Sequence, residues 1–223
     1  MRQKLLQIIT RFRCIFVFLF GIYNHIQPRN RIRTTRLRIK SGITKIDGLR
    51  IRCKGKNNVL YIEDFARIGK CRIDIVGNNN TIRIGSKSIL TKVEFWIEDD
   101  NNTVTIGNDC GMESCVFVLM EGTSAYVGNG CYIAYGTVIR TGDSHSILDM
   151  DGNRTNPSQD VTIGDHVWLA TDVTVLKGTH IADNCIVAAN STLGKHYEEP
   201  NCIIGGMPAK VLKQNINWCG ERI

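Results

Sequence analysis

A six-residue spacing of aliphatic residues is the feature that most constrains how this chain folds. An α-helix repeats its apolar face every 3.6 residues and a single strand every two residues, so neither element alone produces a period of six. The period instead predicts a coil of short strands, in which each six-residue unit supplies one strand and one corner. The aliphatic positions that follow it are Val127, Ile133 and Ile139 and, after a break, Ile163, Leu169, Val175, Ile181, Val187 and Leu193.

Small or β-branched residues accompany this repeat, four positions after the aliphatic residue. A tight corner has no room for bulk, so these positions agree with a turn of the chain in every unit. Three of them are cysteines, which we expect to pack as small hydrophobic residues rather than to bind metal or undergo redox chemistry. The set comprises Ala66, Ser88, Cys110, Cys131, Val167, Val173, Thr179, Cys185 and Ser191.

Paired asparagines recur upstream with a longer period of 22 residues. Asn57-Asn58, Asn79-Asn80 and Asn101-Asn102 each precede a short apolar segment. Asparagine tolerates the left-handed backbone conformation, so we expect the pairs at corners, in coils that carry about four more residues than the later ones.

The composition indicates a chain with a sizeable core and no covalent cross-links. Hydrophobic residues make up 43% of the 223 residues, which excludes wholesale disorder. The nine cysteines are an odd number and are spread along the chain without a Cys-x-x-Cys pair. This pattern argues against a disulfide framework and a structural zinc site, and it predicts reduced thiols in a cytoplasmic protein without a bound metal.

The first 56 residues differ from the rest in charge. They contain 15 of the 28 Lys and Arg residues and one acidic residue, whereas the remainder has 13 basic and 20 acidic residues. Within this basic segment, the apolar run Cys14–Tyr23 would form a helix about 15 Å long, too short to cross a ~30 Å hydrocarbon layer. We therefore expect a helix that lies at an anionic membrane surface; packing on this chain or on a sister subunit is the alternative.

Two other interpretations of the basic segment are disfavoured. No small-x-small cleavage signal follows Tyr23, which argues against a secretory signal peptide. No nucleic-acid-binding motif accompanies the arginines, so we expect no nucleic-acid partner.

The repeat resembles that of the hexapeptide-repeat acyltransferases. The unit [Ile/Val/Leu]-[Gly/Ala]-x-x-[small]-x runs from about residue 62 to residue 213, and Ile204–Lys213 resembles the closing Gly-x-Pro-Ala-[Lys/Arg]-x-[Ile/Leu] element of that family. The resemblance implies an all-β fold, a left-handed parallel β-helix that assembles as a homotrimer. We divide the chain into a basic, helical N-terminal segment (1–45), the β-helix (46–206) with an inserted loop (140–160), and a C-terminal tail (207–223).

The break in the six-residue register is where we expect the chemistry. A loop of about twenty residues in a regular solenoid is typically functional or disordered. This loop contains Asp143-Ser-His145 and is followed by Ile-Gly-Asp-His-Val-Trp168. Both segments resemble active-site elements of the polysaccharide and sugar O-acetyltransferases in the family. The resemblance implies that His145 is the general base and that Trp168 contributes to the active site.

An imidazole suits this task because a sugar hydroxyl attacks a thioester well only if its proton is removed during the attack. We expect Asp143 to accept a hydrogen bond from the other ring nitrogen of His145 and to stabilise the imidazolium, with Asp149 and Asp151 as alternatives. His166 is a rival base, although its place within a six-residue unit favours a position on the outer wall of the coil.

Acetyl-CoA is the donor that the resemblance implies, bound between adjacent subunits. Ala170 and Ala188 would line its pantetheine arm, because only small side chains admit an extended ligand. Lys195, Lys210 and Lys213 would meet its phosphates. The family pattern has glycine-containing pairs where the two alanines stand in this chain.

We therefore expect an acetyl-CoA-dependent O-acyltransferase that acetylates a sugar hydroxyl of bacterial surface polysaccharide, such as capsule, O-antigen or exopolysaccharide, at the inner face of the cytoplasmic membrane. An acetyltransferase of a free sugar or antibiotic and a non-catalytic, membrane-associated scaffold are the alternatives. The carbonic anhydrases that share this coil are disfavoured, because the intervals between His145, His166 and His180 do not supply three zinc ligands.

Overall fold

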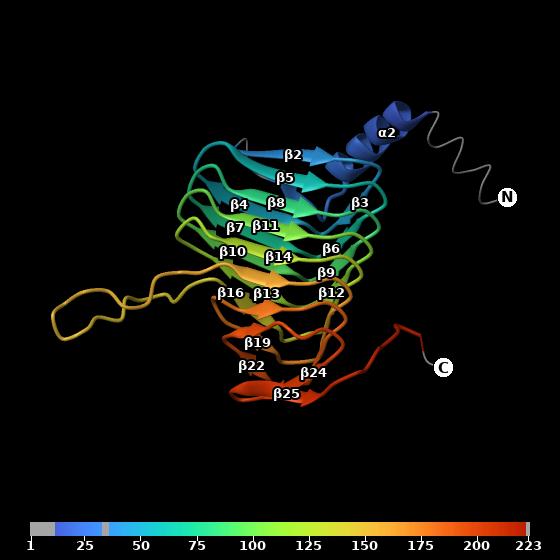
Figure 1. Ribbon diagram of the computed structural model, residues 1–223. Coiled ribbons are helices and arrows are strands. Elements are labelled where there is room, and N and C mark those ends of the chain that lie inside the picture. The colour runs from blue at the N-terminus through green and yellow to red at the C-terminus, as the bar shows by residue number, and fades with distance from the viewer. Residues whose placement is uncertain (1–11, 33–35, 222–223) are drawn as a thin grey trace.

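Three parallel β-sheets wind into a triangular coil (Figure 1). The structure is a computed structural model, and it describes residues 12–32 and 36–221. The sheets, named A, B and C here, contain eight, eight and nine strands, and each strand of the coil pairs in parallel with the strand one turn later. Successive turns are therefore separated by one strand spacing, about 4.8 Å. This confirms the expected all-β fold, a left-handed parallel β-helix.

The strands of one turn follow one another in the order B, C, A. Sheet A consists of β1 (Arg31–Ile32), β4 (Arg50–Lys54), β7 (Arg72–Val76), β10 (Glu94–Glu98), β13 (Val116–Leu119), β16 (Val138–Arg140), β19 (Thr174–Val175) and β22 (Thr192–Leu193). Sheet B consists of β2 (Leu37–Ser41), β5 (Asn58–Ile62), β8 (Thr81–Ile84), β11 (Thr103–Ile106), β14 (Ser124–Val127), β17 (Val161–Ile163), β20 (His180–Ile181) and β23 (His196–Tyr197). Sheet C consists of β3 (Lys45–Asp47), β6 (Arg67–Gly69), β9 (Ile89–Thr91), β12 (Gly111–Glu113), β15 (Tyr132–Ile133), β18 (Trp168–Leu169), β21 (Ile186–Val187), β24 (Ile203–Gly206) and β25 (Ala209–Lys213).

The core is the inside of this coil. On sheet B, Val127 pairs in register with Ile163, and Ile163 with Ile181, and all three side chains are fully buried. The small residues four positions later in each unit are buried as well, including the cysteines at 110, 131 and 185. The six-residue period therefore marks the inward positions of the coil, as expected.

The first asparagine of each pair turns the chain at a corner. Asn57, Asn79 and Asn101 have φ angles of 57°, 57° and 65°, in the left-handed region. This confirms the expectation for these positions. All three lie at the corner between sheets A and B, which also carries the inserted loop, so one edge of the prism holds the longest connections.

The second asparagine of each pair has a different role, which the sequence did not reveal. Asn58, Asn80 and Asn102 are buried and form a ladder along the coil axis. Asn58 Oδ1 accepts a hydrogen bond from the amide of Asn80 (2.9 Å), and Asn80 Oδ1 accepts one from the amide of Asn102 (2.8 Å). The amide groups also donate to corner carbonyls, as from Asn80 to Asp99 (3.0 Å). The ladder thus satisfies backbone groups that the wide corner leaves inside the coil.

Removing one rung should destabilise the protein without changing its surface. In Asn80→Leu, the amide of Asn102 loses its partner and the carbonyl of Asp99 loses one of its two side-chain donors, and a buried unpaired group costs about 1–3 kcal/mol. Urea unfolding followed by circular dichroism should show this loss. The matched control is Asn79→Gly, because glycine adopts the same φ angle and the side chain of Asn79 is exposed. This control variant should change the free energy of unfolding by less than about 0.5 kcal/mol. Equal effects of the two variants would contradict the role of the ladder.

Helix α2 (Arg13–Ile26) lies at the N-terminal end of the coil (Figure 1). Its buried Asn24 accepts a hydrogen bond from the amide of Ile46 (2.9 Å) and donates one to the carbonyl of Thr44 (3.0 Å). Asn24 therefore provides hydrogen-bond partners for backbone groups at the edge of sheet C, where no further strand pairs with β3. Strands β1 and β2 already pair in parallel with β4 and β5, so the coil begins within residues 1–45, which were assigned above to the N-terminal segment.

The C-terminal end of the coil is closed by β25, which pairs antiparallel with β24. β25 thus adds a strand to sheet C from within the segment assigned to the tail. The tail beyond it then runs back along the outside of the coil, and it brings Trp218 against sheet C.

Candidate active site

The inserted loop leaves the coil as a long arm between β16 of sheet A and β17 of sheet B (Figure 1). Its two limbs are joined by hydrogen bonds from the amide of Thr155 to the carbonyl of Ile147 (2.8 Å) and from Gln159 to Thr141 (2.8 Å). Glu121, at the same corner one turn earlier, pairs with Arg154 and accepts a hydrogen bond from the amide of Ser158. These bonds, that from Arg154 above all, lower the pKa of Glu121 to about 2. The arm is therefore tied to the coil at its base.

Asn156 and Lys177 hold the limb that carries His145. Asn156 is only 7% exposed, and its Nδ2 donates to the carbonyl of His145 (2.9 Å) and to Asp143 Oδ2 (2.8 Å). Lys177 Nζ donates to the same carboxylate oxygen (2.6 Å) and to the carbonyl of Asn156 (3.0 Å). Both residues were missed by the sequence reasoning, because neither belongs to a recognisable motif and Lys177 lies three strands, or one full turn of the coil, after the loop.

This arrangement gives Asp143 a structural task that was not expected. Hydrogen bonds from Lys177 and then Asn156 hold the pKa of Asp143 below its usual range. The ionised carboxylate therefore anchors the loop at neutral pH, and the anchor weakens only as the pH falls through that lowered pKa. Within one chain, no hydrogen bond joins Asp143 to the imidazole of His145 among the described residues, because its Oδ2 is directed to Lys177 and Asn156 instead.

The two alternative carboxylates do not orient His145 either. Asp149 Oδ1 accepts hydrogen bonds from the amides of Asp151 (2.9 Å) and Asn153 (2.8 Å), so it shapes the turn at the tip of the arm. Hydrogen bonds from the backbone and side chain of Asn153 lower the pKa of Asp149. The side chain of Asp151 is exposed. His145 is likewise exposed on the arm, so its imidazole is accessible to a substrate but unpartnered by the described part of this chain.

Trp168 lies on the outer face of sheet C, in an aromatic cluster with Tyr132 and Trp218. The ring centroids of Trp218 are 5.4 Å from Tyr132 and 6.0 Å from Trp168. Trp218 also stacks on the ring of His166 (4.1 Å, interplanar angle 6°) and donates from Nε1 to the His166 carbonyl (2.9 Å). Trp218 was not predicted, because nothing in the tail sequence shows that it folds back along the coil.

His166 has structural partners that account for its position. Besides the stack with Trp218, its Nδ1 lies 3.0 Å from Asn184 Oδ1, one turn further along the coil. Its φ of 55° places it at a corner, next to sheet C. The expected position of His166 on the outer wall agrees with this geometry.

The five residues predicted to bind acetyl-CoA occupy three separate places on one chain. Ala170 and Ala188 follow β18 and β21, so they stack at the corner between sheets C and A. Lys195 lies at the corner between sheets A and B, with Nζ 5.5 Å from the ring of Tyr197. Lys210 and Lys213 project from β25, at the end of the coil. A single chain therefore does not assemble these residues into one groove.

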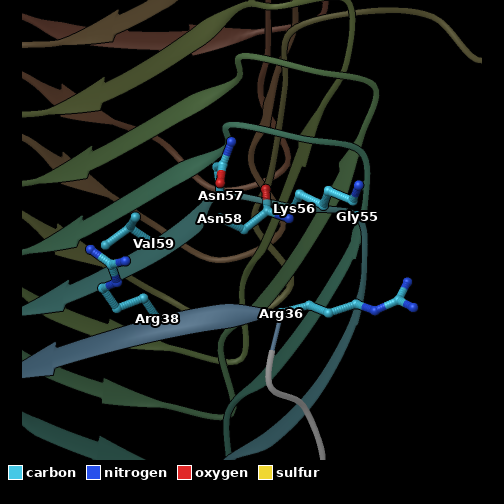
Figure 2. A pocket seen from close by; sticks show the side chains of 7 residues that line it. All are labelled: Arg36, Arg38, Gly55, Lys56, Asn57, Asn58 and Val59. Atoms are coloured by element: carbon cyan, nitrogen blue, oxygen red, sulfur yellow. The ribbon is translucent and has the colours of Figure 1, made fainter.

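A strongly basic surface covers the opposite end of the coil. A hollow of about 350 Å³ lies at the corner between sheets A and B. Figure 2 shows the residues that line it, among them Arg36, Arg38 and Lys56. A neighbouring groove of about 480 Å³ on sheet A is lined by Arg31, Arg50, Arg52, Lys54 and Arg72, with Asp74 as its acidic residue. Asp74 is paired with Arg72, so the surface keeps a large excess of positive charge.

Neither membrane-spanning helices nor metal clusters occur in the described part of the chain. In residues 12–32 and 36–221, no helix is long and apolar enough to cross a membrane. The same residues contain no group of three or more His, Cys, Asp or Glu side chains arranged to hold a metal ion.

The coil and its projecting loop define the class of protein: a left-handed β-helix transferase built on hexapeptide repeats. A family model described as bacterial transferase hexapeptide (six repeats) matches residues 160–195. A probable macrolide acetyltransferase of Lysinibacillus sphaericus is 32% identical, over 46% of this chain and 74% of the relative. The chain belongs to the hexapeptide-repeat acyltransferase family, which confirms the resemblance drawn from its repeat.

Polysaccharide-modifying proteins are among the relatives. A polysialic acid O-acetyltransferase of Neisseria meningitidis is 34% identical over 93 residues, which are 41% of this chain and 43% of the relative, so the match spans less than half of that protein. The crystal structure of NeuO, a polySia-specific acetyltransferase, superposes with a TM-score of 0.71 at 25% identity, over 83% of this chain and 88% of that chain.

Proposed function

We propose that the protein is an O-acetyltransferase that transfers the acetyl group of acetyl-CoA to a sugar hydroxyl of bacterial surface polysaccharide. The observation that carries this proposal is the tethered arm, which holds an accessible imidazole outside an otherwise regular coil. The relatives that act on polysialic acid supply the substrate class.

The reaction needs one base and no covalent intermediate. As the sugar oxygen attacks the thioester carbonyl, its proton passes to a ring nitrogen of His145, and a tetrahedral oxyanion forms. The carbon–sulfur bond then breaks, and the imidazolium returns the proton to the departing thiolate. The sugar ester and coenzyme A are the products. Asn156 and Lys177 hold the arm, so that the imidazole keeps its position during the transfer.

The active site of this proposal forms between chains of a homotrimer. His145 lies on the arm at the corner between sheets A and B, whereas Trp168 lies on sheet C, a different face of the prism. The arm also exposes large apolar side chains in a single chain: Ile147 is 59%, Leu148 57% and Met150 102% exposed. A neighbouring subunit that received the arm would cover these side chains and bring His145 to its own Trp168.

An acceptor screen tests the function directly. The full-length protein is incubated with acetyl-CoA and polymeric, lipid-linked or nucleotide-activated sugars, and free thiol is measured together with mass spectrometry of the glycan. Acceptor-dependent thiol release with a mass gain of one acetyl group supports the proposal. Thiol release only with free antibiotics would replace it by the second candidate.

That second candidate is an acetyltransferase of a free small molecule. The observation that favours it is the similarity to the probable macrolide acetyltransferase of Lysinibacillus sphaericus, of which the chain covers 74%. The chemistry at His145 would be the same, because both acceptors offer a hydroxyl. A macrolide therefore belongs in the same screen.

The N-terminal end of the coil supports contact with an anionic membrane. Helix α2 exposes a set of large apolar side chains, and the basic surface of sheet A lies at the same end of the molecule. An amphipathic surface of this kind binds lipid by burying apolar side chains and attracting anionic headgroups. The exposed set comprises Ile15, Phe18, Leu19, Ile22 and Ile26. These features support our proposal that the protein contacts the inner face of the cytoplasmic membrane.

Substituting the apolar face of α2 should release the protein from vesicles. The triple variant Phe18→Ser, Ile22→Ser, Ile26→Ser keeps Asn24 and so preserves the contact of the helix with sheet C. We expect at least about a tenfold loss of binding to phosphatidylglycerol vesicles in a flotation assay, since each buried methylene contributes ~0.8 kcal/mol. Leu212→Ser, an exposed change at the other end, should have no effect. Unchanged flotation with an altered oligomeric state would show that α2 packs on a sister subunit instead.

A further inference from the structure

An open groove of about 600 Å³ lies on the outer face of sheet C, over β9, β12 and β15. These strands belong to the side of the coil seen at the right of Figure 1. The groove ends at Trp168, so it is continuous with the aromatic cluster described above. Trp168 is the one residue of the expected active site that lines this groove, and none of the five expected acetyl-CoA contacts does.

The hollow exists because one position in a row of large residues is glycine. Ile89, Gly111, Tyr132 and Trp168 are successive register partners on sheet C, and the other three side chains are all partly exposed. A Cβ added at Gly111 would lie 3.2 Å from Cδ1 of Tyr132. The absence of a side chain therefore lets the tyrosine ring lean over the groove and form one wall.

The tail holds this wall in place. Trp218 packs against the ring of Tyr132, and a Cβ at Gly220 would lie 2.7 Å from Cε2 of that ring. The backbone of the tail thus crosses close to Tyr132, and the ring is supported by residues far apart in the sequence. An aromatic side chain fixed in this way provides a rigid surface at little cost in conformational entropy.

The rim of the groove is polar and slightly acidic. Glu113 and Thr91 lie in register on one side, and Asp109 and Lys87 lie on the other. Lys87 Nζ is 3.8 Å from Asp109 Oδ1, so these two charges offset each other. The carboxylate of Glu113 then accounts for the net negative charge of the rim. Among the described residues that line the groove, two are acidic and one is basic.

We propose that this groove binds an uncharged pyranose unit of the acceptor, with its C–H face against Tyr132 and Trp168 and its hydroxyl groups donating to Glu113 and Asp109. The inference rests on the proposed function, and it identifies the site and the charge class of the sugar beside the reacting one. Sugar hydroxyls pair well with carboxylates, whereas the carboxylate of an acidic sugar would meet like charge on the rim. An acceptor built of acidic sugars alone, such as polysialic acid, does not fit this rim.

Saturation-transfer NMR with the full-length protein tests the groove without any need for turnover. The probes are methyl α-glucopyranoside, methyl β-galactopyranoside and N-acetylglucosamine, with N-acetylneuraminic acid as the anionic comparison. We expect saturable transfer to at least one uncharged pyranose, and at least about fivefold weaker binding of the anionic sugar. Equal or tighter binding of N-acetylneuraminic acid would overturn the proposal.

Two variants locate the binding in the groove. Gly111→Leu fills the hollow and Tyr132→Ala removes its wall, and each should weaken binding of the uncharged sugar by at least about tenfold. The matched control is Tyr126→Ala, because Tyr126 is similarly exposed on the outer face of sheet B. Glu113→Gln keeps the shape and should raise the relative affinity for N-acetylneuraminic acid. Binding that survives both Gly111→Leu and Tyr132→Ala, with the proteins folded, would show that the sugar binds elsewhere.

The outcomes separate this inference from the proposed function. If the wild-type protein acetylates a glycan but Gly111→Leu leaves the KM for that glycan unchanged, the enzyme stands and the groove assignment fails. If uncharged pyranoses bind in the groove but no acceptor supports thiol release, the proposed function fails and the binding site stands.

Discussion

Replacing His145 with alanine should lower kcat by about two to four orders of magnitude, because general base catalysis by a placed imidazole contributes that much. The attack of the sugar hydroxyl would then depend on water to remove the proton. Acceptor-dependent thiol release under saturating acetyl-CoA and acceptor measures the effect. The KM values should change little, because the imidazole is expected to accept a proton in the transition state and not to bind either substrate in the ground state.

The exposed position of His145 allows this test to separate an effect on catalysis from an effect on folding. Its side chain is exposed and its imidazole forms no hydrogen bond in the described part of the chain, so the variant should unfold at nearly the same temperature as the wild type. His25→Ala, an exposed histidine change in α2, is the matched control and should retain full turnover. Near-normal kcat in His145→Ala would reject the assignment of the base, whatever the acceptor.

Mixing two inactive variants should restore activity. If each active site takes His145 from one chain and Trp168 from its neighbour, a 1:1 mixture of His145→Ala and Trp168→Ala subunits contains sites in which both residues are intact. Random assembly of a cyclic trimer gives about a quarter of all sites in this state, and every trimer that contains both variants has one such site in its three, so we expect about a third of wild-type turnover from purified mixed trimers. Co-expression with two different affinity tags, followed by tandem purification, provides the mixed oligomers for the assay.

The control for this experiment replaces one partner by the double variant. Mixed oligomers of His145→Ala with the His145→Ala, Trp168→Ala chain contain no intact site and should stay inactive. Size-exclusion chromatography with light scattering gives the oligomeric state of each sample. Absence of any recovery in well-formed mixed trimers would place the site within one chain, or would remove Trp168 from it.

The candidate site could be predicted from the sequence only in part. The loop and its histidine stood out because they interrupt a regular repeat. The partners of the loop did not, since Asn156 and Lys177 reach Asp143 through side-chain contacts that carry no local pattern. The expected pair of Asp143 with His145 was drawn from sequence proximity, whereas the structure directs the carboxylate to a lysine 34 residues away.

The groove on sheet C is a stronger example of the same limit. Nothing in the sequence around Gly111 indicates a binding site, and Tyr132 and Trp168 are separated from it by 21 and 57 positions. Only the parallel register places them side by side, and only the returning tail brings Trp218 and Gly220 against the tyrosine.

The repeat by itself determined the coil, its corners and its interior, because each of these depends on which residue type can occupy a given position of the six-residue unit. Aliphatic side chains mark the inside, small ones the corners and the first asparagines the left-handed turns, and such preferences are local. The tertiary structure alone decided what lies on the outside. Residues that are neighbours on the outer surface are one or more turns apart in sequence. The contacts of the arm and the tail depend on which turns of the coil lie beside them in space.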